Sequence, residues 1–396
     1  MAENKKDFSW PVNGMDYENY EAFCTWFTQY EPIINERQLI IWGAGSRGTG
    51  FATLMRKMGF DKFLFVDSSP RIWGGCICGT DIIEPDKLEQ YRERVILVSP
   101  ENSGEIEKYL NSHNYKKDED YFLIQTRTYE AYIEEFLRPY GKKTLILGSC
   151  EFSAISLDDK DFRSMREMLF EKLGKDTTKI LAIHGIGLRA QYHILHAQIM
   201  SGMVPERLLL QISIDTLVAK DHLFPHTQHA KLLKMIVDTQ NKPSNEFLEY
   251  VSIAEERSRN PFMNPFEGFG TGMVKAKIRN YYKYYYMADL EENAEGLAYL
   301  KKILDEASAN DIEVIPFVLP VNYQLAKELL ADEFDTKYKH TLDIVQEVTD
   351  ANGLLNLSYA LDSELFAWPE APNASLNDQG REKIAEMLCS QIEGMV

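Results

Sequence analysis

The sequence has no long uninterrupted apolar run, few cysteines and a deficit of basic residues. No stretch of the 396 residues approaches the roughly 18 apolar residues that a membrane-spanning helix requires, so we expect no membrane span. The five cysteines are scattered, which excludes the disulfide framework of a small secreted protein and favours a reducing compartment: Cys24, Cys76, Cys78, Cys150 and Cys389. With 43 basic against 61 acidic residues the net charge is −18, and such a surface repels nucleic acid and anionic lipid. We therefore expect a cytoplasmic protein that binds neither.

The length and the alternation of predicted elements indicate two domains of the α/β class. A chain of 396 residues is too long for one ordinary core. A charged amphipathic stretch, 127–143, marks the predicted boundary, so the domains are 1–138 and 139–396. Apolar strands alternate with helical patterns in both, which predicts parallel sheets covered by helices on both faces, in three layers.

The first domain opens with a pattern that is typical of nucleotide-binding turns. The short apolar run 39–43 leads into a G-x-G-x-x-G turn that begins at its last residue, then a helical pattern, then a second apolar run that ends at Asp67. In this context the glycines allow a tight turn, close approach of a pyrophosphate, and helix packing, while the acid accepts hydrogen bonds from ribose hydroxyls. The predicted nucleotide-binding residues are Gly43, Gly45, Ser46, Arg47, Gly48 and Asp67. The alternative is that the glycines serve only the turn.

The residues after Asp67 carry a family resemblance. Ser68-Ser-Pro70, Gly74-Gly75, Gly79 and the segment 82–88 (Ile-Ile-Glu-Pro-Asp-Lys-Leu) resemble the small Rossmann-like domain of bacterial surface-polysaccharide proteins. The resemblance implies a nucleotide ligand, either NAD(P) or a nucleotide-sugar. The domain is short for a dehydrogenase and shows no partner for a hydride donor, so we exclude that activity.

In the second domain, polar residues follow four predicted strands. The run 144–147 leads into Gly148-Ser149-Cys150-Glu151, 179–183 into His184 and Gly185, 208–212 into Asp215, and 314–319 into Asn322. A strand, a sharp glycine turn and a small nucleophilic residue at a helix start form a hydrolase-like arrangement. Because ligands gather at the carboxyl ends of parallel strands, these residues are expected to share one site.

Several short motifs make this domain similar to the SGNH (GDSL) hydrolases, and within them to the D-alanyl-transfer (DltD) proteins. They are Leu147-Gly-Ser-Cys-Glu-Phe152, the turn from Gly185 to Gln191, Leu319-Pro-Val-Asn322, and Ser375-Leu-Asn377 with Gly380. The resemblance implies a pocket lined by Gly185, Gly187, Gln191, Asp215, Asn322 and Ser375.

The departures from that family concern its chemistry. Cys150 stands where the family has serine, Ser375 where it has histidine, Pro372 where it has the supporting aspartate, and Asp215 where an asparagine helps the oxyanion hole. Since a serine hydroxyl without a base is inert, ordinary serine hydrolysis is excluded. Two functions stay open. One is a non-catalytic binding or accessory protein of cell-surface glycopolymer biosynthesis, which takes a nucleotide and a glycan or acyl ligand and meets protein partners of that pathway. The other is an acyltransferase or thioesterase with Cys150 as nucleophile and His184 as base.

Other conspicuous segments are given ordinary roles. His222, His226 and His229 lack a completing carboxylate pair, and Cys76 with Cys78 lacks a second cysteine pair, so no metal site is predicted. The segment 260–272, rich in Gly, Pro and Phe, is either a flap or a packed loop, and the tyrosine-rich 275–286 either faces a sugar or belongs to the core.

Overall fold

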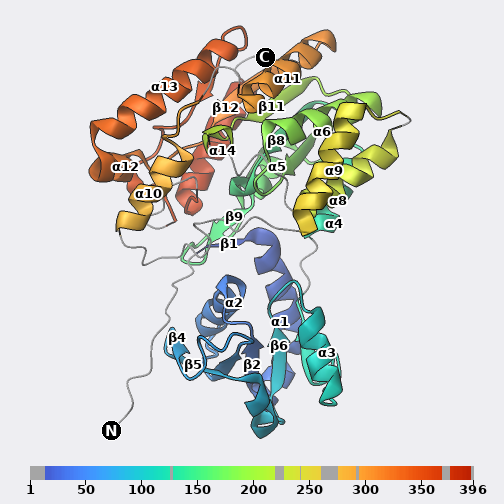
Figure 1. Cartoon of the computed structure of the whole chain (residues 1–396), viewed down its shortest axis with the longest axis vertical. Helices are drawn as coiled ribbons and strands as arrows, with labels where there is room; N and C mark the ends of the chain where they lie inside the picture. The colour runs from blue at the N-terminus through green and yellow to red at the C-terminus, as the bar shows by residue number, and fades with distance from the viewer. Residues whose placement is uncertain are drawn as a thin grey trace. The chain divides into compact units, whose positions relative to one another are not determined.

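The protein divides into two compact units in a computed structural model that describes residues 14–124, 128–218, 227–240, 242–259, 275–290, 294–367 and 375–393. The first unit takes the chain up to Arg127 and regains it for Ile155–Phe162, while the second takes Thr128–Ala154 and the other described residues. In Figure 1 the first unit, up to about residue 127, is coloured blue to teal, and most of the second unit is coloured green to red.

The first unit contains a six-stranded sheet in the order β4-β5-β3-β2-β6-β7. Its strands pair in parallel, except for β4, which is antiparallel to β5. From β2 the chain adds strands first on one side (β3, β5) and then on the other (β6, β7), so the order reverses between β2 and β6. The strands are β2 (Leu39–Trp42), β3 (Phe63–Val66), β4 (Cys76–Ile77), β5 (Thr80–Ile83), β6 (Val95–Val98) and β7 (Tyr121–Leu123).

Helices cover both faces of this sheet because its strands are buried on both sides. Ile41, Phe65 and Leu97 face a core that includes Phe23 and Phe51 from α1 (Tyr17–Arg37) and α2 (Ser46–Lys57). The alternate strand residues face a second core with α3 (Gly104–Ser112). A 3-10 helix, η1 (Pro85–Tyr91), follows β5.

The bounds of the units differ from the predicted boundary at 138/139. Helix α4 (Thr128–Leu137) belongs to the second unit, since its Phe136 is fully buried in that unit's core. In the other direction, β9 (Ala154–Ser156) pairs with β1 (Gly14–Asp16), Leu157 joins the first unit's core, and Phe162 stacks on Tyr20 with ring centroids 4.7 Å apart. Hydropathy patterns along the chain do not reveal such a short excursion.

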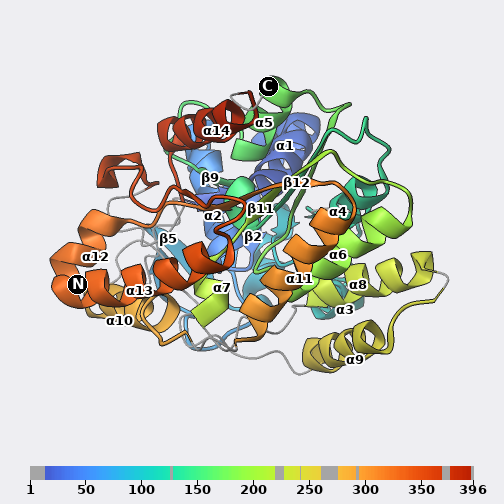
Figure 2. The same cartoon turned by 90° about the horizontal axis from the view of Figure 1, so that it is seen from above.

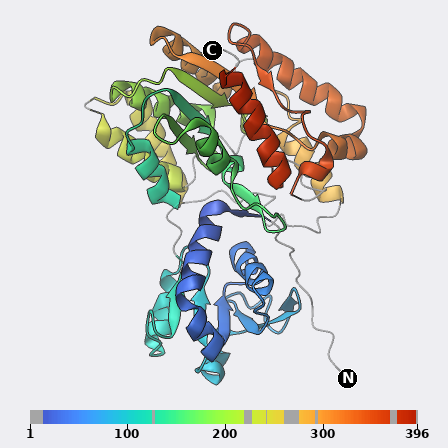
Figure 3. The same cartoon turned by 180° about the vertical axis from the view of Figure 1, so that it is seen from behind.

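The second unit is built on a five-stranded, all-parallel sheet in the order β10-β8-β11-β12-β13. Its strands are β8 (Thr144–Gly148), β10 (Thr178–Ala182), β11 (Arg207–Gln211), β12 (Glu313–Val318) and β13 (Leu355–Asn356). Figure 2 shows α5 and α14 on one side of β11 and β12, and α6 and α11 on the other. Helices α5 and α14 pack together and lie side by side in Figure 3.

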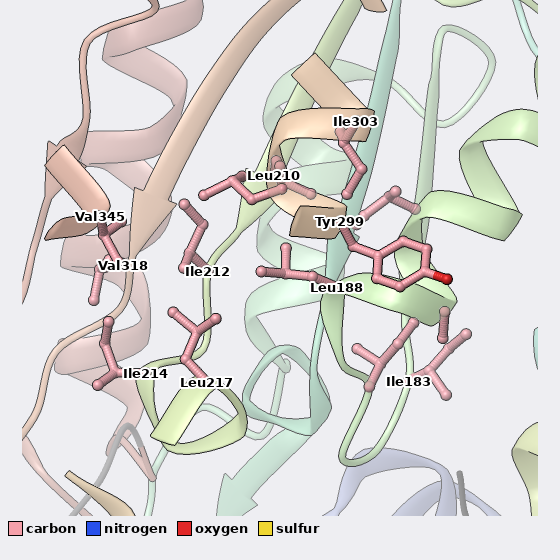
Figure 4. Close-up of a cluster of buried hydrophobic side chains, with 14 of the residues drawn as sticks. Ile183, Leu188, Leu210, Ile212, Ile214, Leu217, Tyr299, Ile303, Val318 and Val345 are labelled. Atoms are coloured by element: carbon pink, nitrogen blue, oxygen red, sulfur yellow. The ribbon is translucent and has the colours of Figure 1, made fainter. Parts of the chain in front are cut away.

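Alternate residues of the strands separate two cores. Ile146 and Leu209 face α5 (Met165–Leu173) and α14 (Asp378–Glu393), whereas Leu145 and Leu208 face the larger core. The larger core is closed by α4 and these further helices: α6 (Leu188–Met200), α7 (Ile214–Val218), α8 (Thr227–Thr239), α9 (Asn245–Arg259), α10 (Lys275–Tyr285), α11 (Glu295–Ala309), α12 (Tyr323–Leu330) and α13 (Asp332–Val348). In Figure 4, Leu188 of α6 and Leu217 of α7 approach Ile212, which follows β11. Short 3-10 turns, η2 (Cys150–Phe152) and η4 (Ser363–Leu365), complete the unit. The prediction of an α/β fold with parallel sheets and helices on both faces is confirmed.

Candidate functional site

The carboxyl edge of the second unit's sheet contains a point where the strand order reverses. The chain goes from β8 to β10 on one side, and then to β11 on the other side of β8. In open α/β sheets the loops that leave two such neighbouring strands run in opposite directions, and ligands bind outside the carboxyl ends of those strands. Cys150 and Glu151 leave β8 at this point, and Asp215 follows β11.

The turn after β8 is held by a buried glutamine that sequence reasoning missed. Gln211, the last residue of β11, accepts the backbone N–H of Ser149 at 2.8 Å and donates to the Ser149 hydroxyl at 2.9 Å. Its amide nitrogen also donates to the Ser213 hydroxyl at 3.0 Å and lies 3.4 Å from a carboxylate oxygen of Glu151. Gly148 is required here, because a Cβ would come within 2.6 Å of the Phe152 ring and 2.9 Å of Gln211 Oε1. The signal in the sequence was a polar residue ending an otherwise apolar buried strand.

Glu151 and Asp215 form an electrostatically linked acidic pair at this edge of the sheet. Loss of solvation raises the pKa of Glu151 far above its ordinary value, and the charge of Asp215 raises it further. Loss of solvation likewise raises the pKa of Asp215, although backbone N–H groups, including that of Thr216 at 2.9 Å, partly oppose the shift. The charge of His184 lowers the pKa of both carboxyls and so opposes the effect of burial. Asp215 was predicted to belong to this site, whereas Glu151 was not.

Cys150 and Tyr281 reach the same edge. Cys150 is partly exposed and begins η2. Tyr281, on α10, has a pKa raised by burial and by the charges of Asp215, Glu151 and Cys150, so all three lie within its electrostatic range. His184 is exposed, in the turn after β10. His184 thus acts electrostatically on Glu151 and Asp215, and these two carboxyls together with Cys150 act on Tyr281. That Cys150, His184 and Asp215 share one site stays a prediction.

Other predicted pocket residues shape turns, cap helices or make buried hydrogen bonds. Gly185 has a φ of +62° in the turn after His184, and Gly187 is the N-cap of α6. The Gln191 amide donates to the Gln211 carbonyl at 3.2 Å, and among the described residues its buried Oε1 finds no hydrogen-bond partner. Asn322 is fully buried and caps α12, and its side-chain oxygen accepts the Leu325 N–H at 3.2 Å and the Ser363 hydroxyl at 2.7 Å.

The segment around Ser375 is only partly described. The Ser375 carbonyl accepts the Ala367 N–H at 2.8 Å, beside a bridge between Phe366 and Leu376. Pro372, the position of the supporting aspartate in the resembling family, lies outside the described residues. The backbone of Ser375 is therefore anchored to the chain around Phe366.

In the first unit, the glycine turn has the conformation that its sequence requires. Gly43 has a φ of +104°, and a Cβ on Gly48 would come within 1.9 Å of the Gly43 carbonyl oxygen. A Cβ on Gly45, the N-cap of α2, would meet nothing within 4 Å, and Ser46 beside it is exposed. The first and third glycines thus serve the backbone and the packing, while the second leaves open space before the helix N-terminus.

Asp67 and Arg47 are held by the protein itself. The two carboxylate oxygens of Asp67 accept the N–H groups of Ala44 and Ser69, both at 2.8 Å. The Arg47 side chain donates to Asn19 and to the carbonyls of Ser99 and Ile124. Burial lowers the Arg47 pKa, and this guanidinium fastens strand ends instead of facing the open turn, which corrects its predicted place in the site.

This turn fits a diphosphate and a ribose, through fewer residues than predicted. The first N–H groups of a helix have no partner inside the helix, so those at the start of α2 are suited to a phosphate in the open space at Gly45. Each carboxylate oxygen accepts two hydrogen bonds, so Asp67 retains capacity for a ribose hydroxyl. Gly45, Ser46 and Asp67 are therefore the residues that would hold a nucleotide.

Other predicted features divide between the core and residues outside the description. Tyr282, Tyr285 and Tyr286 are buried, as the core interpretation of 275–286 expects. The segment 260–272, His222, His226 and the His229 side chain lie outside the described residues. Across the described ranges, no group of three or more His, Cys, Asp or Glu side chains is arranged to hold a metal ion. Of the helices in those ranges, none combines the length and the apolar character that crossing a bilayer demands.

Comparison with known proteins identifies no family. No family model and no curated protein matches this sequence. Among solved structures, the chain is similar to an acetyl xylan esterase, Est2A, from the rumen bacterium Butyrivibrio proteoclasticus, at 10% sequence identity and a TM-score of 0.27. The match covers 65% of this chain and spans 65% of the esterase chain. A likeness of this size carries no argument about function, so the functional proposal depends on the site.

Proposed function

We propose that this chain is a binding or accessory protein of bacterial cell-surface glycopolymer biosynthesis. In this proposal the first unit takes a nucleotide or nucleotide-sugar, and the second unit binds a hydroxyl-rich glycan ligand at the carboxyl edge of β8 and β11 without hydrolysing it. The pathway is supported by the sequence resemblances of both domains. The absence of hydrolysis is supported by the acidic residues around Cys150 at this edge.

The observation that carries the proposal is the acidic pair Glu151 and Asp215. Acyl transfer needs hydrogen-bond donors aimed at the oxygen on which negative charge develops. Here Glu151 lies in the turn that presents Cys150, and its pKa is raised by the charge of Asp215, which stands at the position of an oxyanion-hole asparagine in the resembling family. When ionised, they repel such a charge and disfavour a thiolate on Cys150. The same carboxylates accept hydrogen bonds from sugar hydroxyls, and Tyr281 adds an aromatic face of the kind that sugar rings stack on.

The first experiment measures binding and turnover together. Calorimetric titration with a panel of oligosaccharides, at pH 7.5, should find a ligand whose Kd rises about tenfold or more in Asp215→Asn, since losing a charge-assisted hydrogen bond costs about 1.5–3 kcal/mol. Asp289→Asn is the matched control, because it removes the same charge from an exposed carboxylate paired with Lys337. Ester or thioester hydrolysis by the wild type that depends on Cys150 would contradict the proposal.

The second candidate function is acyl transfer or thioester hydrolysis through Cys150. It is favoured by one observation: Cys150 is partly exposed at a strand end, with His184 exposed in the turn of the neighbouring strand. Iodoacetamide at pH 7 should then label Cys150 much faster than Cys24, which is similarly part-exposed, and Cys150→Ser should abolish turnover. Equal labelling of Cys150 and Cys24 would eliminate this function.

The nucleotide proposal for the first unit has its own test. A thermal-shift panel of NAD(P) and nucleotide-sugars should reveal a stabilising ligand. Gly45→Ala should weaken binding of that ligand, because the added Cβ would stand where the phosphate approaches. The melting temperature of the free protein should not fall, since this Cβ meets no protein atom within 4 Å. Stabilisation of Gly45→Ala equal to that of the wild type would place the ligand elsewhere.

A further inference from the structure

Trp73 is an exposed aromatic residue whose position is fixed from two sides. Its side chain is 37% exposed, whereas large aromatic side chains usually gain stability from burial. The indole N–H donates to the backbone carbonyl of Asp67 at 2.6 Å. The next residue, Gly74, donates its N–H to the Ile82 carbonyl on β5 at 3.0 Å. The ring is therefore held at the carboxyl ends of β3 and β5.

The groups around Trp73 follow the order of the parts of a nucleotide. The open space at Gly45 lies before the N-terminus of α2, and the adjacent Ala44 N–H donates to the Asp67 carboxylate at 2.8 Å. The Asp67 carbonyl in turn holds the indole. These hydrogen bonds link the open space at Gly45 to Asp67 and Asp67 to the indole, which is the order in which phosphate, ribose and base are joined.

From this arrangement we propose that Trp73 is the stacking platform for the base of a nucleotide bound to the first unit. The inference rests on the nucleotide proposal and deepens it, because it requires an aromatic base and not only a diphosphate or a sugar phosphate. A base has an apolar π-face that an indole covers, and stacking on an aromatic side chain is tolerant of base identity. The platform thus predicts affinity for nucleotides as a class, with base selectivity left to other contacts.

Binding measurements on the full chain test this role. Titration calorimetry with ADP, UDP and inorganic pyrophosphate compares two ligands that carry a base with one that does not. Trp73→Ala should weaken ADP and UDP by roughly 5- to 100-fold, the range expected from loss of one stacked base, and leave pyrophosphate within about twofold. Trp73→Phe, which keeps a ring and loses the indole N–H, should retain most of the affinity. Wild-type tryptophan emission should be quenched by ADP, and this quenching should be lost in Trp73→Phe.

The controls separate a stacking role from a structural one. Met58→Ala removes a side chain of similar exposure, 38%, at the opposite end of α2, and should change none of the three affinities. If Trp73→Ala weakens pyrophosphate as much as ADP, or leaves ADP binding unchanged, the platform is refuted while the nucleotide proposal stands. If the wild type binds none of ADP, UDP, NAD(P) and the nucleotide-sugars, both proposals fall.

Discussion

Gln211 offers a test of how the turn that carries Cys150 is held. Gln211→Met keeps the length and much of the volume of the side chain but removes its hydrogen bonds. Ser149 is only 4% exposed, and its backbone N–H donates to the Gln211 side chain at 2.8 Å. In the variant this buried N–H loses its acceptor. An unsatisfied buried N–H costs about 1–3 kcal/mol, and the lost bonds to the Ser149 and Ser213 hydroxyls add about 0.5–1.5 kcal/mol each before those hydroxyls rotate to other partners. We expect a net loss of about 3 kcal/mol.

The matched control lies on the neighbouring helix. Gln191 is as buried as Gln211, at 1% against 2%, but its amide makes one hydrogen bond, at 3.2 Å, and its Oε1 has no partner among the described residues. Gln191→Met removes that unsatisfied oxygen, which offsets the lost bond, so we expect a change within about 1 kcal/mol. The two variants therefore share a chemical change and differ in the hydrogen bonds that are lost.

Scanning calorimetry distinguishes them. For a unit of this size about 3 kcal/mol corresponds to a fall of roughly 6–12 °C in the melting temperature, against less than about 4 °C for Gln191→Met. If Gln211→Met melts within about 2 °C of the wild type, or no lower than Gln191→Met, the Gln211 network does not hold the turn and the reasoning is refuted.

Three further outcomes are expected. Because Glu151 has a pKa raised from 4.5 to about 7, and Asp215 one raised from 3.8, the folded protein retains protons that the unfolded chain releases. Their contribution to stability therefore falls as pH rises from about 4 to about 7. In urea unfolding at several pH values, the free energy of unfolding of Glu151→Gln should depend less on pH than that of the wild type and should be greater at pH 8. Gly48→Ala, whose Cβ would meet the Gly43 carbonyl oxygen at 1.9 Å, should lose roughly 1–3 kcal/mol or more in urea unfolding, whereas an unchanged midpoint would contradict the packing. Burial lowers the pKa of Lys179 from 10.5 to about 8, so its contribution to stability rises with pH between these values, and Lys179→Met should remove that rise in unfolding titrations.

Much of the fold followed from local patterns. The runs 39–43 and 144–147 predicted buried parallel strands, and both lie inside the two sheets, the first as β2, which ends one residue earlier, and the second as most of β8. A strand covered on both faces needs apolar residues at every position, which distinguishes it from a surface element without knowledge of its neighbours. The glycine turn before α2 was equally legible, because a positive φ at Gly43 and the contact at Gly48 require glycine whatever binds there.

The polar partners of the site were not legible in the same way. Gln211 lies far from Ser149 along the chain, and only the pairing of β11 with β8 brings the two together. Arg47, predicted to face a nucleotide, instead reaches carbonyls at the ends of other strands, because a long side chain takes whichever acceptors the packed unit presents. The excursion of Ile155–Phe162 into the first unit depends likewise on partners distant in sequence.

The sequence by itself determined the fold class, the glycine turn, and the presence of Cys150, His184 and Asp215 after three strands, because strand periodicity and backbone sterics are local properties. Tertiary structure alone decided which of these side chains share an environment. The raised pKa of Glu151 arises from burial and from the charge of Asp215, and that of Asp215 arises from burial; both depend on the strand order around β8 and β11. Electrostatic character depends on distances through space, and the order of residues along the chain does not encode those distances.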